Sequence, residues 1–336
     1  MEPEDPSAAG IVAWQRRLAG ADPGVVALVD RTDPVLRDAF ALPLLNALAE
    51  RVAGGGPRPL MLLNGPVGSG KSTLGRLLEA LAPQAGVRLA VASIDDLYLP
   101  LDRRLAVLAG NPFGVSRVPP GSHDLPLLLQ RLADWRARGV LLLPRFDKTL
   151  AGGRGERAPQ AKGLAADALV LEGWLMGCRP LGEDALSLLT ASGRIAGGCT
   201  DPGQGLALTP QELQWLPRWN RELREYLPLW QMADGLWLLR PLNWTLPYRW
   251  RLQAEARQRR SGGGWMRAEE VRALVRATLA SLPPPLYQDP LVGQGMVTSS
   301  SEADLPLMGV VELDGRRRCR RPCAQPSASS ASSAMG

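Results

Sequence analysis

Residues 60–74 read LMLLNGPVGSGKSTL. This stretch begins with a short apolar run, continues through a glycine-rich turn and ends where a helical pattern of apolar residues starts. Its glycines, lysine and serine match the spacing G-x-x-x-x-G-K-[ST] between Gly65 and Ser72. Because a strand precedes this loop and a helix follows it, the sequence predicts a nucleotide-binding protein rather than an ordinary glycine-rich surface turn.

The predicted loop binds phosphate mainly through its backbone. Its glycines let several N–H groups turn toward an anion, and the dipole of the following helix adds to the attraction. We expect the Lys71 ammonium to reach the β- and γ-phosphates and the Ser72 hydroxyl to hold Mg²⁺. The predicted nucleotide-binding residues are Gly65, Pro66, Val67, Gly68, Ser69, Gly70, Lys71, Ser72 and Thr73.

The composition is typical of a globular protein. The 336 residues allow one large domain or two ordinary ones, and the hydrophobic fraction of 45% is sufficient for a core. No apolar run reaches the length of about 18 residues that a membrane span needs. The first residues, MEPEDPSAAG, carry acids and no basic group, unlike a targeting peptide. We therefore expect a cytoplasmic protein without a membrane partner.

The net charge of +6 arises at the C-terminal end of the chain. Residues 315–336 contain five arginines and no acidic residue, so the rest of the chain carries only +1. The Pro, Ala and Ser residues that follow the arginines are typical of disordered segments. We therefore expect a disordered, Arg-rich and then Ser/Ala-rich tail at 315–336. A charge confined to such a tail does not favour nucleic acid as a partner.

Histidine and lysine are rare. His123 is the only histidine, which excludes a multi-histidine metal site, so we expect a carboxylate as any general base. Lysine occurs only at Lys71, Lys148 and Lys162, whereas 36 of the 39 basic residues are arginine. Because lysine and arginine bind phosphates and carboxylates differently, Lys148 becomes a candidate site residue beside Lys71. The four scattered cysteines predict free thiols rather than a zinc site.

Apolar strands alternate with amphipathic helices along most of the chain. This alternation predicts the α/β class, with a doubly wound parallel sheet of the P-loop NTPase type and flanking helices. The expected strands are 60–63, 87–94, 139–146, 168–171 and 235–240, with a last edge strand at 308–313. The expected helices run up to about residue 56 and over 72–86, 125–139, 208–231 (with Thr209 as N-cap), 244–260 and 268–281. Residues 187–205 lack a clear period and are expected to form a loop or a weak insertion.

Acidic side chains follow two of the predicted strands. Asp95 and Asp96 come after the second strand, and Glu172 follows the fourth. Ligands of open parallel sheets bind at the carboxyl ends of the strands, so these acids are expected to face the phosphate loop. There Asp95 would take the proton of an acceptor hydroxyl, and Glu172 would hold Mg²⁺ together with Ser72. The alternatives are an acid pair that begins a turn and a glutamate that caps a helix.

Two further segments carry candidates for binding the acceptor. In the first, PPGSHDL, His123 would contact the acceptor, and Asp124 would either do so or cap the helix that begins at Leu125. The second is a glycine-rich loop whose basic residues suit an anionic substrate, the alternative being a solvated basic loop. The predicted substrate-binding residues are His123, Asp124, Arg145, Asp147, Lys148, Arg154 and Arg157.

The sequence from about Leu60 to Gln288 resembles glycerate kinases of the plant and fungal type, which are related to uridine kinase, pantothenate kinase and phosphoribulokinase. The matching stretches are GPVGSGKST, SIDDLY, PPGSHDL, PRFDKTLAGGRGER, VLEGWLMG, NRELREY and YRWRLQAE. The first is shared by all P-loop proteins, whereas SIDD and EGW-x-x-G are far narrower. One departure is Leu97, which stands where the family usually has Phe before Tyr98.

The resemblance implies the reaction ATP + D-glycerate → 3-phosphoglycerate + ADP with Mg²⁺, often in photorespiration. It also implies a helical lid over ATP. We expect a kinase domain at 57–314, and the apolar spacing before it predicts a helical lead-in at 1–56 that packs on the core. The predicted catalytic residues are Lys71, from the phosphate-loop motif, and Asp95, Asp96 and Arg251, which the resemblance adds. Asp95 matches the family's base, and Arg251 lies on the helix that would close over ATP.

Other functions stay open at this point. The same frame suits uridine, pantothenate or a sugar phosphate as acceptor, because the pocket and not the fold decides the substrate. A nucleotide-switch GTPase would need a guanine-reading N-K-x-D segment, which this chain lacks. A nucleic-acid-binding ATPase would rest only on the basic tail. We expect a monomer or a small homo-oligomer.

Overall fold

The structure, a computed structural model, describes residues 13–159, 162–192, 207–262, 264–292 and 305–320. Its centre is a six-stranded sheet with the order β10-β9-β8-β1-β7-β2. These strands are β1 Leu60–Asn64, β2 Leu89–Ser93, β7 Ala168–Gly173, β8 Gly235–Pro241, β9 Leu307–Leu313 and β10 Cys319–Arg320. All neighbours pair in parallel except β9 and β10. The predicted α/β class with a mainly parallel sheet is confirmed.

The carboxyl ends of three neighbouring strands align at one edge of the sheet. Leu63 of β1 pairs in register with Glu172 of β7, which pairs in turn with Ser93 of β2. Every residue of β1 and β7 is buried, as is typical of parallel strands that are covered on both faces. The phosphate loop leaves β1 at this edge and Asp95 follows β2 there. Groups that are far apart in the sequence therefore converge.

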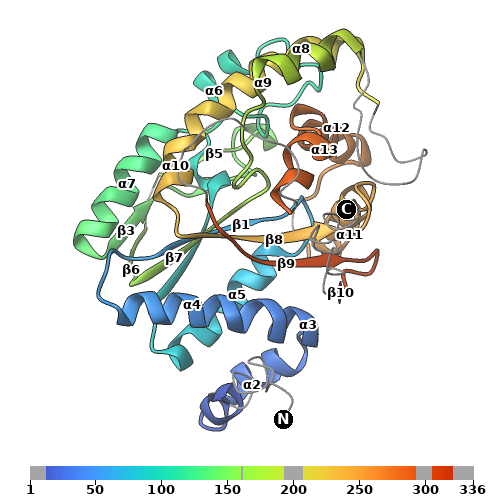
Figure 1. Ribbon diagram of the computed structural model, residues 1–336. Coiled ribbons are helices and arrows are strands. Elements are labelled where there is room, and N and C mark those ends of the chain that lie inside the picture. The colour runs from blue at the N-terminus through green and yellow to red at the C-terminus, as the bar shows by residue number, and fades with distance from the viewer. Residues whose placement is uncertain (1–12, 160–161, 193–206, 263, 293–304, 321–336) are drawn as a thin grey trace, which may run out of the picture.

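Helices cover both faces of the sheet (Figure 1). Leu48 of α4 (Leu42–Ala53) and Leu78 of α5 (Lys71–Leu81) belong to the buried cluster on one face. The cluster on the other face contains residues of α7 Leu125–Arg138, α9 Pro210–Glu222, α10 Leu227–Met232 and α12 Ala268–Ser281. The remaining helices are α2 Pro23–Asp30, α3 Pro34–Leu36, α6 Leu101–Val107, α8 Glu183–Ser192, α11 Leu246–Arg260 and α13 Pro284–Tyr287. Among the described residues, no helix combines the length and the apolar character needed to span a bilayer.

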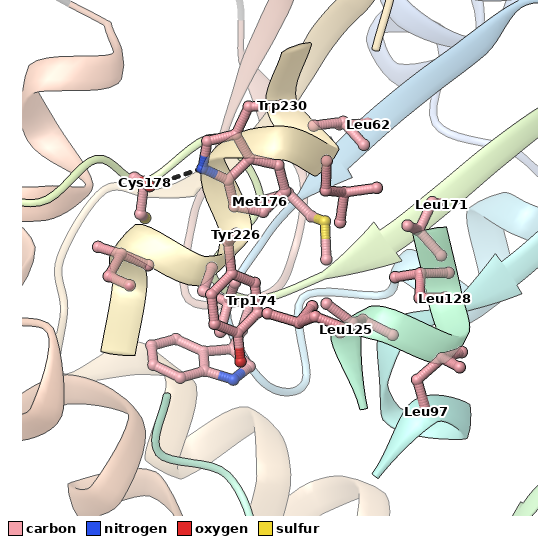
Figure 2. Close-up of a cluster of buried hydrophobic side chains, with 14 of the residues drawn as sticks. Leu62, Leu97, Leu125, Leu128, Leu171, Trp174, Met176, Cys178, Tyr226 and Trp230 are labelled. Atoms are coloured by element: carbon pink, nitrogen blue, oxygen red, sulfur yellow. Dashed lines mark hydrogen bonds between the residues drawn. The ribbon is translucent and has the colours of Figure 1, made fainter. Parts of the chain in front are cut away.

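A buried cluster holds the loop that follows β7 (Figure 2). The indole Nε1 of Trp230 in α10 donates a hydrogen bond of 2.9 Å to the carbonyl of Cys178. Met176 and Tyr226 are buried in the same cluster. Because the loop is fixed between β7 and α10, the side chain of Trp174 is held at the edge where the strands end.

The third predicted strand does not belong to the central sheet. Its core, β3 Val140–Leu143, pairs antiparallel with β6 Lys162–Ala165 in a separate two-stranded sheet. In β3, buried and exposed residues alternate, as in a strand with one solvent-facing side. Its uniformly apolar composition concealed this alternation and made it look like a central strand. The polar residues that follow it lie in another small hairpin, β4 Phe146–Asp147 with β5 Glu156–Arg157.

Two helical predictions need correction. The expected long helix 208–231 divides into α9 and α10, with a 3₁₀ turn at Leu223–Tyr226 between them. Pro228 at the start of α10 lacks an N–H and crowds the carbonyl four residues earlier, which prevents a continuous helix. Residues 183–192 form α8 where a loop was expected from 187 onward; acids in its first turn favour such a helix start. The rest of that segment, 193–206, lies outside the described residues. The N-cap at Thr209 is confirmed, within a capping box with Glu212.

The expected tail begins later than residue 315. Residues 314–318 form a turn, and Cys319–Arg320 form the short strand β10 at the edge of the central sheet. The predicted last strand, β9, is therefore covered on both sides by other strands rather than lying at the edge. The charge and composition of this segment did not predict the pairing, because arginines occur in exposed edge strands as well as in disordered segments. Residues 321–336 lie outside the described residues.

Candidate active site

The phosphate loop connects β1 to α5. Gly68 and Gly70 adopt φ values of +79° and +102°, a left-handed region that other residues rarely enter. A Cβ at Gly68 would also lie 2.9 Å from the Cβ of Trp250, so α11 packs too closely for any side chain there. The glycines thus permit both the turn of the loop and the approach of α11.

Lys71 lies between the loop and β7. Its Nζ donates to the carbonyls of Gly65, at 2.7 Å, and Pro66, at 3.3 Å, and it lies 3.6 Å from Oε2 of Glu172. The side chains of Lys71 and Glu172 are 12% and 11% exposed. The ammonium and the carboxylate are therefore held together at the end of β7, next to the loop.

A cavity of about 570 Å³ opens at this edge of the sheet. Its polar lining comes from the phosphate loop, the end of β2, the β4 hairpin, the end of β7, α11 and α12. The residues that line it with polar or aromatic side chains are Lys71, Ser72, Ser93, Asp95, Asp96, Tyr98, Arg117, Arg145, Phe146, Lys148, Glu172, Trp174, Arg251 and Thr278. Apolar residues of β2, β3 and β6 complete the wall.

Asp95 is the carboxylate best placed to act in this cavity. Its Oδ2 lies 3.0 Å from Nζ of Lys148. Burial opposes ionisation of Asp95, but the charge and hydrogen bond of Lys148, together with His123 and a hydrogen bond from Tyr98, outweigh it and hold the pKa of Asp95 well below its usual range. Asp95 is therefore ionised at neutral pH and available to accept a hydrogen bond.

Asp96, which also lines the cavity, makes a different contact from its neighbour. Its Oδ1 accepts a hydrogen bond of 2.9 Å from the backbone N–H of Phe146. Burial raises the pKa of Asp96, and the nearby charge of Asp95 adds to this effect. Asp96 thus attaches the β4 hairpin to the end of β2, and this attachment brings Lys148 to Asp95.

Arg104 fixes the loops around the cavity. It is fully buried and donates to the carbonyls of Leu99, Ser116, Arg154 and Gly155 at distances between 2.6 and 3.1 Å. Its guanidinium carbon also lies 4.9 Å from the centre of the Phe146 ring. One buried side chain therefore joins three segments: the turn after β2, the segment after α6 and the loop of the β4 hairpin.

Comparisons with known proteins agree with this geometry. No protein-family model matches the chain. A relative from Arabidopsis thaliana named D-glycerate 3-kinase, chloroplastic, is 29% identical over 273 residues, which cover 77% of this chain and 53% of that protein. The chain thus spans about half the length of the Arabidopsis protein. An uncharacterized kinase of Schizosaccharomyces pombe is 30% identical over 213 residues, 59% of this chain and 70% of that protein.

The chain belongs to this family of P-loop kinases. Its fold agrees with a solved structure of D-glycerate 3-kinase from Cryptococcus neoformans, with a TM-score of 0.66 and 28% identity. That match covers 82% of this chain and 94% of the Cryptococcus chain. The resemblance identified from the sequence motifs is confirmed.

The cavity of this P-loop kinase brings together many of the predicted site residues. Those that line it are Val67, Gly68, Lys71, Ser72, Asp95, Asp96, Arg145, Lys148, Glu172 and Arg251. Arg251 pairs with Glu255 at 2.5 Å, while its buried Nε has no partner among the described residues. The other loop residues, Gly65, Pro66, Ser69, Gly70 and Thr73, support the turn without lining the cavity.

Five predicted substrate-binding residues do not line the cavity. Asp124 caps α7 and pairs with Arg157 at 2.8 Å, and Arg157 also donates to the carbonyl of Tyr98. Asp147 accepts hydrogen bonds from the backbone and hydroxyl of Thr149. These contacts stabilise the loops around the site. The residues outside the cavity lining are His123, Asp124, Asp147, Arg154 and Arg157.

His123 is buried behind the cavity wall. Its Nδ1 lies 2.7 Å from the hydroxyl of Tyr226, and its ring stacks on Tyr98 with 4.6 Å between ring centres. Burial lowers the pKa of His123 to about 4, so the ring is neutral at pH 7. The histidine therefore supports Tyr98, which lines the cavity, rather than reaching into the cavity itself.

Six residues that line the cavity with polar or aromatic side chains were missed from the sequence. Four of them lie inside the quoted motifs, which therefore contained a signal for them: Ser93, Tyr98, Phe146 and Trp174. Arg117 and Thr278 lie outside all the quoted motifs. Arg117 is almost buried and donates through Nη1 to the carbonyls of Gly153 and Arg154. Only the folded chain places its guanidinium beside the β4 hairpin.

Proposed function

We propose that this P-loop kinase transfers the γ-phosphoryl group of ATP to D-glycerate and forms 3-phosphoglycerate and ADP. The observation that carries the proposal is that Lys71 of the phosphate loop and the ionised Asp95 line the same cavity. The names of the Arabidopsis and Cryptococcus relatives support glycerate as the acceptor. A cavity of about 570 Å³ has room for the phosphate end of a nucleotide and a small hydroxy acid.

On the donor side, Lys71 would exchange its two carbonyl partners for phosphate oxygens. The backbone of the loop would bind the other oxygens, as expected for a glycine-rich turn before a helix. The Ser72 hydroxyl and the Glu172 carboxylate both line the cavity and are oxygen donors that suit Mg²⁺, which needs few protein ligands when phosphates and water complete its shell. When bound there, Mg²⁺ would neutralise charge on the phosphates.

On the acceptor side, Asp95 would accept a hydrogen bond from the reacting hydroxyl. A carboxylate with a low pKa is a weak base, so its first contribution is to orient the hydroxyl oxygen toward the γ-phosphorus. It would take the hydroxyl proton as the new P–O bond forms and the bond to the ADP oxygen breaks. Lys148 keeps Asp95 ionised for this step.

The acceptor's carboxylate needs a cationic partner in the cavity. Among the predicted basic residues, Arg145 and Lys148 line the cavity, whereas Arg154 and Arg157 do not. We assign this role to Arg117 and Arg145, because the carbonyls of residues 153 and 154 fix the guanidinium of Arg117 in place. An arginine held in this way loses little entropy when it binds a carboxylate.

Arg251 would stabilise the phosphoryl group during transfer. It lies on α11 at the cavity, and Glu255 orients its guanidinium. Charge that spreads over the equatorial oxygens of a loose transition state is stabilised by such a cation.

The test is ADP release with purified protein, ATP, Mg²⁺ and a panel of acceptors. The proposal predicts much faster release with D-glycerate than with uridine, pantothenate or ribulose 5-phosphate. Equal turnover of any of these three would contradict glycerate as the preferred acceptor. ADP release that is the same with and without every acceptor would contradict the kinase reaction itself.

A further inference from the structure

An arginine of the C-terminal turn contacts the phosphate loop. Arg317 lies in the turn between β9 and β10, at a left-handed φ of +62°. Asp314 organises this turn, because its Oδ1 accepts from the backbone N–H groups of Arg316 and Arg318. The tight turn directs the side chain of Arg317 away from its basic neighbours and toward the nucleotide end of the sheet.

The guanidinium of Arg317 joins two segments of the proposed site. Its Nε donates 2.8 Å to the carbonyl of Gly68 in the phosphate loop. Its Nη2 donates 2.9 Å to the carbonyl of Trp250 in α11, and the guanidinium carbon lies 5.8 Å from the centre of the Trp250 ring. Arg251, which lines the cavity, follows directly after Trp250.

The turn that carries Arg317 is itself anchored on two sides. The backbone N–H of Cys319 donates 3.1 Å to the carboxylate of Asp33, at the start of α3. The carbonyl of Gly315 lies 3.4 Å from the indole Nε1 of Trp250. The guanidinium therefore extends from a fixed backbone, which is required of a group that positions another.

We propose that Arg317 is a positioning residue for nucleotide binding, which couples the phosphate loop to the helix carrying Arg251. The proposal rests on the proposed function for the ligand, ATP. Gly68 has no side chain that could fix its peptide group, and α11 packs directly against it. Without Arg317, the loop and α11 would lose a shared hydrogen-bond partner and would be held together by packing alone. Burial lowers the pKa of Arg317, in agreement with its removal from bulk water.

The experiment compares ATP binding to the full chain and to Arg317→Gly in the presence of Mg²⁺ and without any acceptor. Glycine accepts a left-handed φ without strain, so this variant removes the guanidinium while keeping the turn. We expect a dissociation constant for ATP about 10-fold higher, as for the loss of a charged hydrogen-bond donor, with a single cooperative thermal transition that shows the variant to be folded. Arg317→Lys, which retains the charge but not the fork of donors, should lie between the two.

Arg316→Ala and Arg318→Ala are the matched controls, because both side chains are exposed on the same turn. Each removes one positive charge and should leave ATP affinity at the wild-type value. Equal ATP affinity for wild type and Arg317→Gly would overturn the coupling role. A loss of ATP affinity in Arg316→Ala and Arg318→Ala equal to that in Arg317→Gly would overturn it as well. Absence of ATP binding to the wild-type chain would instead contradict the proposed function, so the two failures are distinguishable.

Discussion

Lys148 and Asp95 form an ion pair at the cavity, with Nζ 3.0 Å from Oδ2, although 53 residues separate them in the chain. Their side chains are 49% and 30% exposed, so the pair contributes little to stability. Its effect is on ionisation, because the ammonium offsets the cost that burial imposes on the carboxylate. The pair therefore determines the pH range in which Asp95 accepts a hydrogen bond.

Removing the ammonium should change the pH profile of the reaction. A carboxylate with a depressed pKa stays ionised until the pH falls through that low value. In Lys148→Met the burial cost remains while the compensating charge is lost, so the pKa of Asp95 rises. We expect the acid limb of kcat to move to higher pH relative to wild type, measured by ADP release in overlapping buffers. An acid limb at the same pH in both proteins would contradict the role of Lys148.

Removing the carboxylate of Asp95 should depress catalysis itself. Asp95→Asn keeps the shape of the side chain but cannot take a proton. We expect kcat to fall by roughly 10²–10⁴ if Asp95 orients and deprotonates the hydroxyl. ATP affinity should stay close to the wild-type value, which serves as the control for folding. A change confined to KM for the acceptor would place Asp95 in binding alone.

Variants of Arg117 and Arg154 test which of the two arginines binds the carboxylate of the acceptor. Arg117 lines the cavity, whereas Arg154 is exposed and lies outside its lining. Arg117→Gln should raise the KM for D-glycerate about 10- to 100-fold, because a charged hydrogen-bond partner of the carboxylate is lost. Arg154→Gln should leave that KM within about twofold. A larger increase in KM for Arg154→Gln than for Arg117→Gln, measured by steady-state kinetics, would support Arg154 as the substrate-binding residue, as predicted from the sequence.

Arg104 should matter more for stability than any exposed arginine. It is fully buried and satisfies four backbone carbonyls. Arg104→Met removes all four hydrogen bonds, although Arg117 still donates to the carbonyl of Arg154. We expect the free energy of unfolding to fall by more than about 3 kcal/mol. The neighbouring, exposed Arg103 provides the control, and Arg103→Met should be within about 0.5 kcal/mol of wild type. Denaturant titration measures both.

His123 should make stability depend on pH in a defined range. Burial lowers its pKa from the usual 6.5 to about 4, so the folded state resists protonation more than the unfolded state does. The free energy of unfolding should therefore fall as the pH decreases from about 6.5 toward about 4, by at most about 1.4 kcal/mol per unit. Because the chain has no other histidine, His123→Asn should flatten this range. A slope that persists in the variant would assign it to another group.

The part of the site that would bind the phosphates of ATP was predictable, because its sequence motifs are local. The loop from Gly65 to Ser72 is contiguous, and parallel strands place Asp95 and Glu172 at the same edge as that loop. No long-range information was needed to expect these groups together. The fold class followed from the same alternation of strands and helices.

The residues that would bind the acceptor were less predictable, because the direction of each side chain decides whether it lines the cavity. The basic loop was found from composition, but only Arg145 and Lys148 of its candidates line the cavity. Arg104 and Arg117 act through carbonyls up to 51 residues away, and nothing in their local sequence marks them. The contact of Arg317 with Gly68 spans 249 residues and lies in a segment whose composition indicated disorder.

The location of the transferred phosphate tests the central claim most directly. Purified protein is incubated with ATP, Mg²⁺ and D-glycerate, and the product is examined by phosphorus and carbon NMR. We predict a single phosphate ester on C3 of glycerate, formed at the rate of ADP release and formed at least about 10²-fold more slowly by Asp95→Asn. ADP release without any glycerate ester, or an ester at another carbon, would contradict the account.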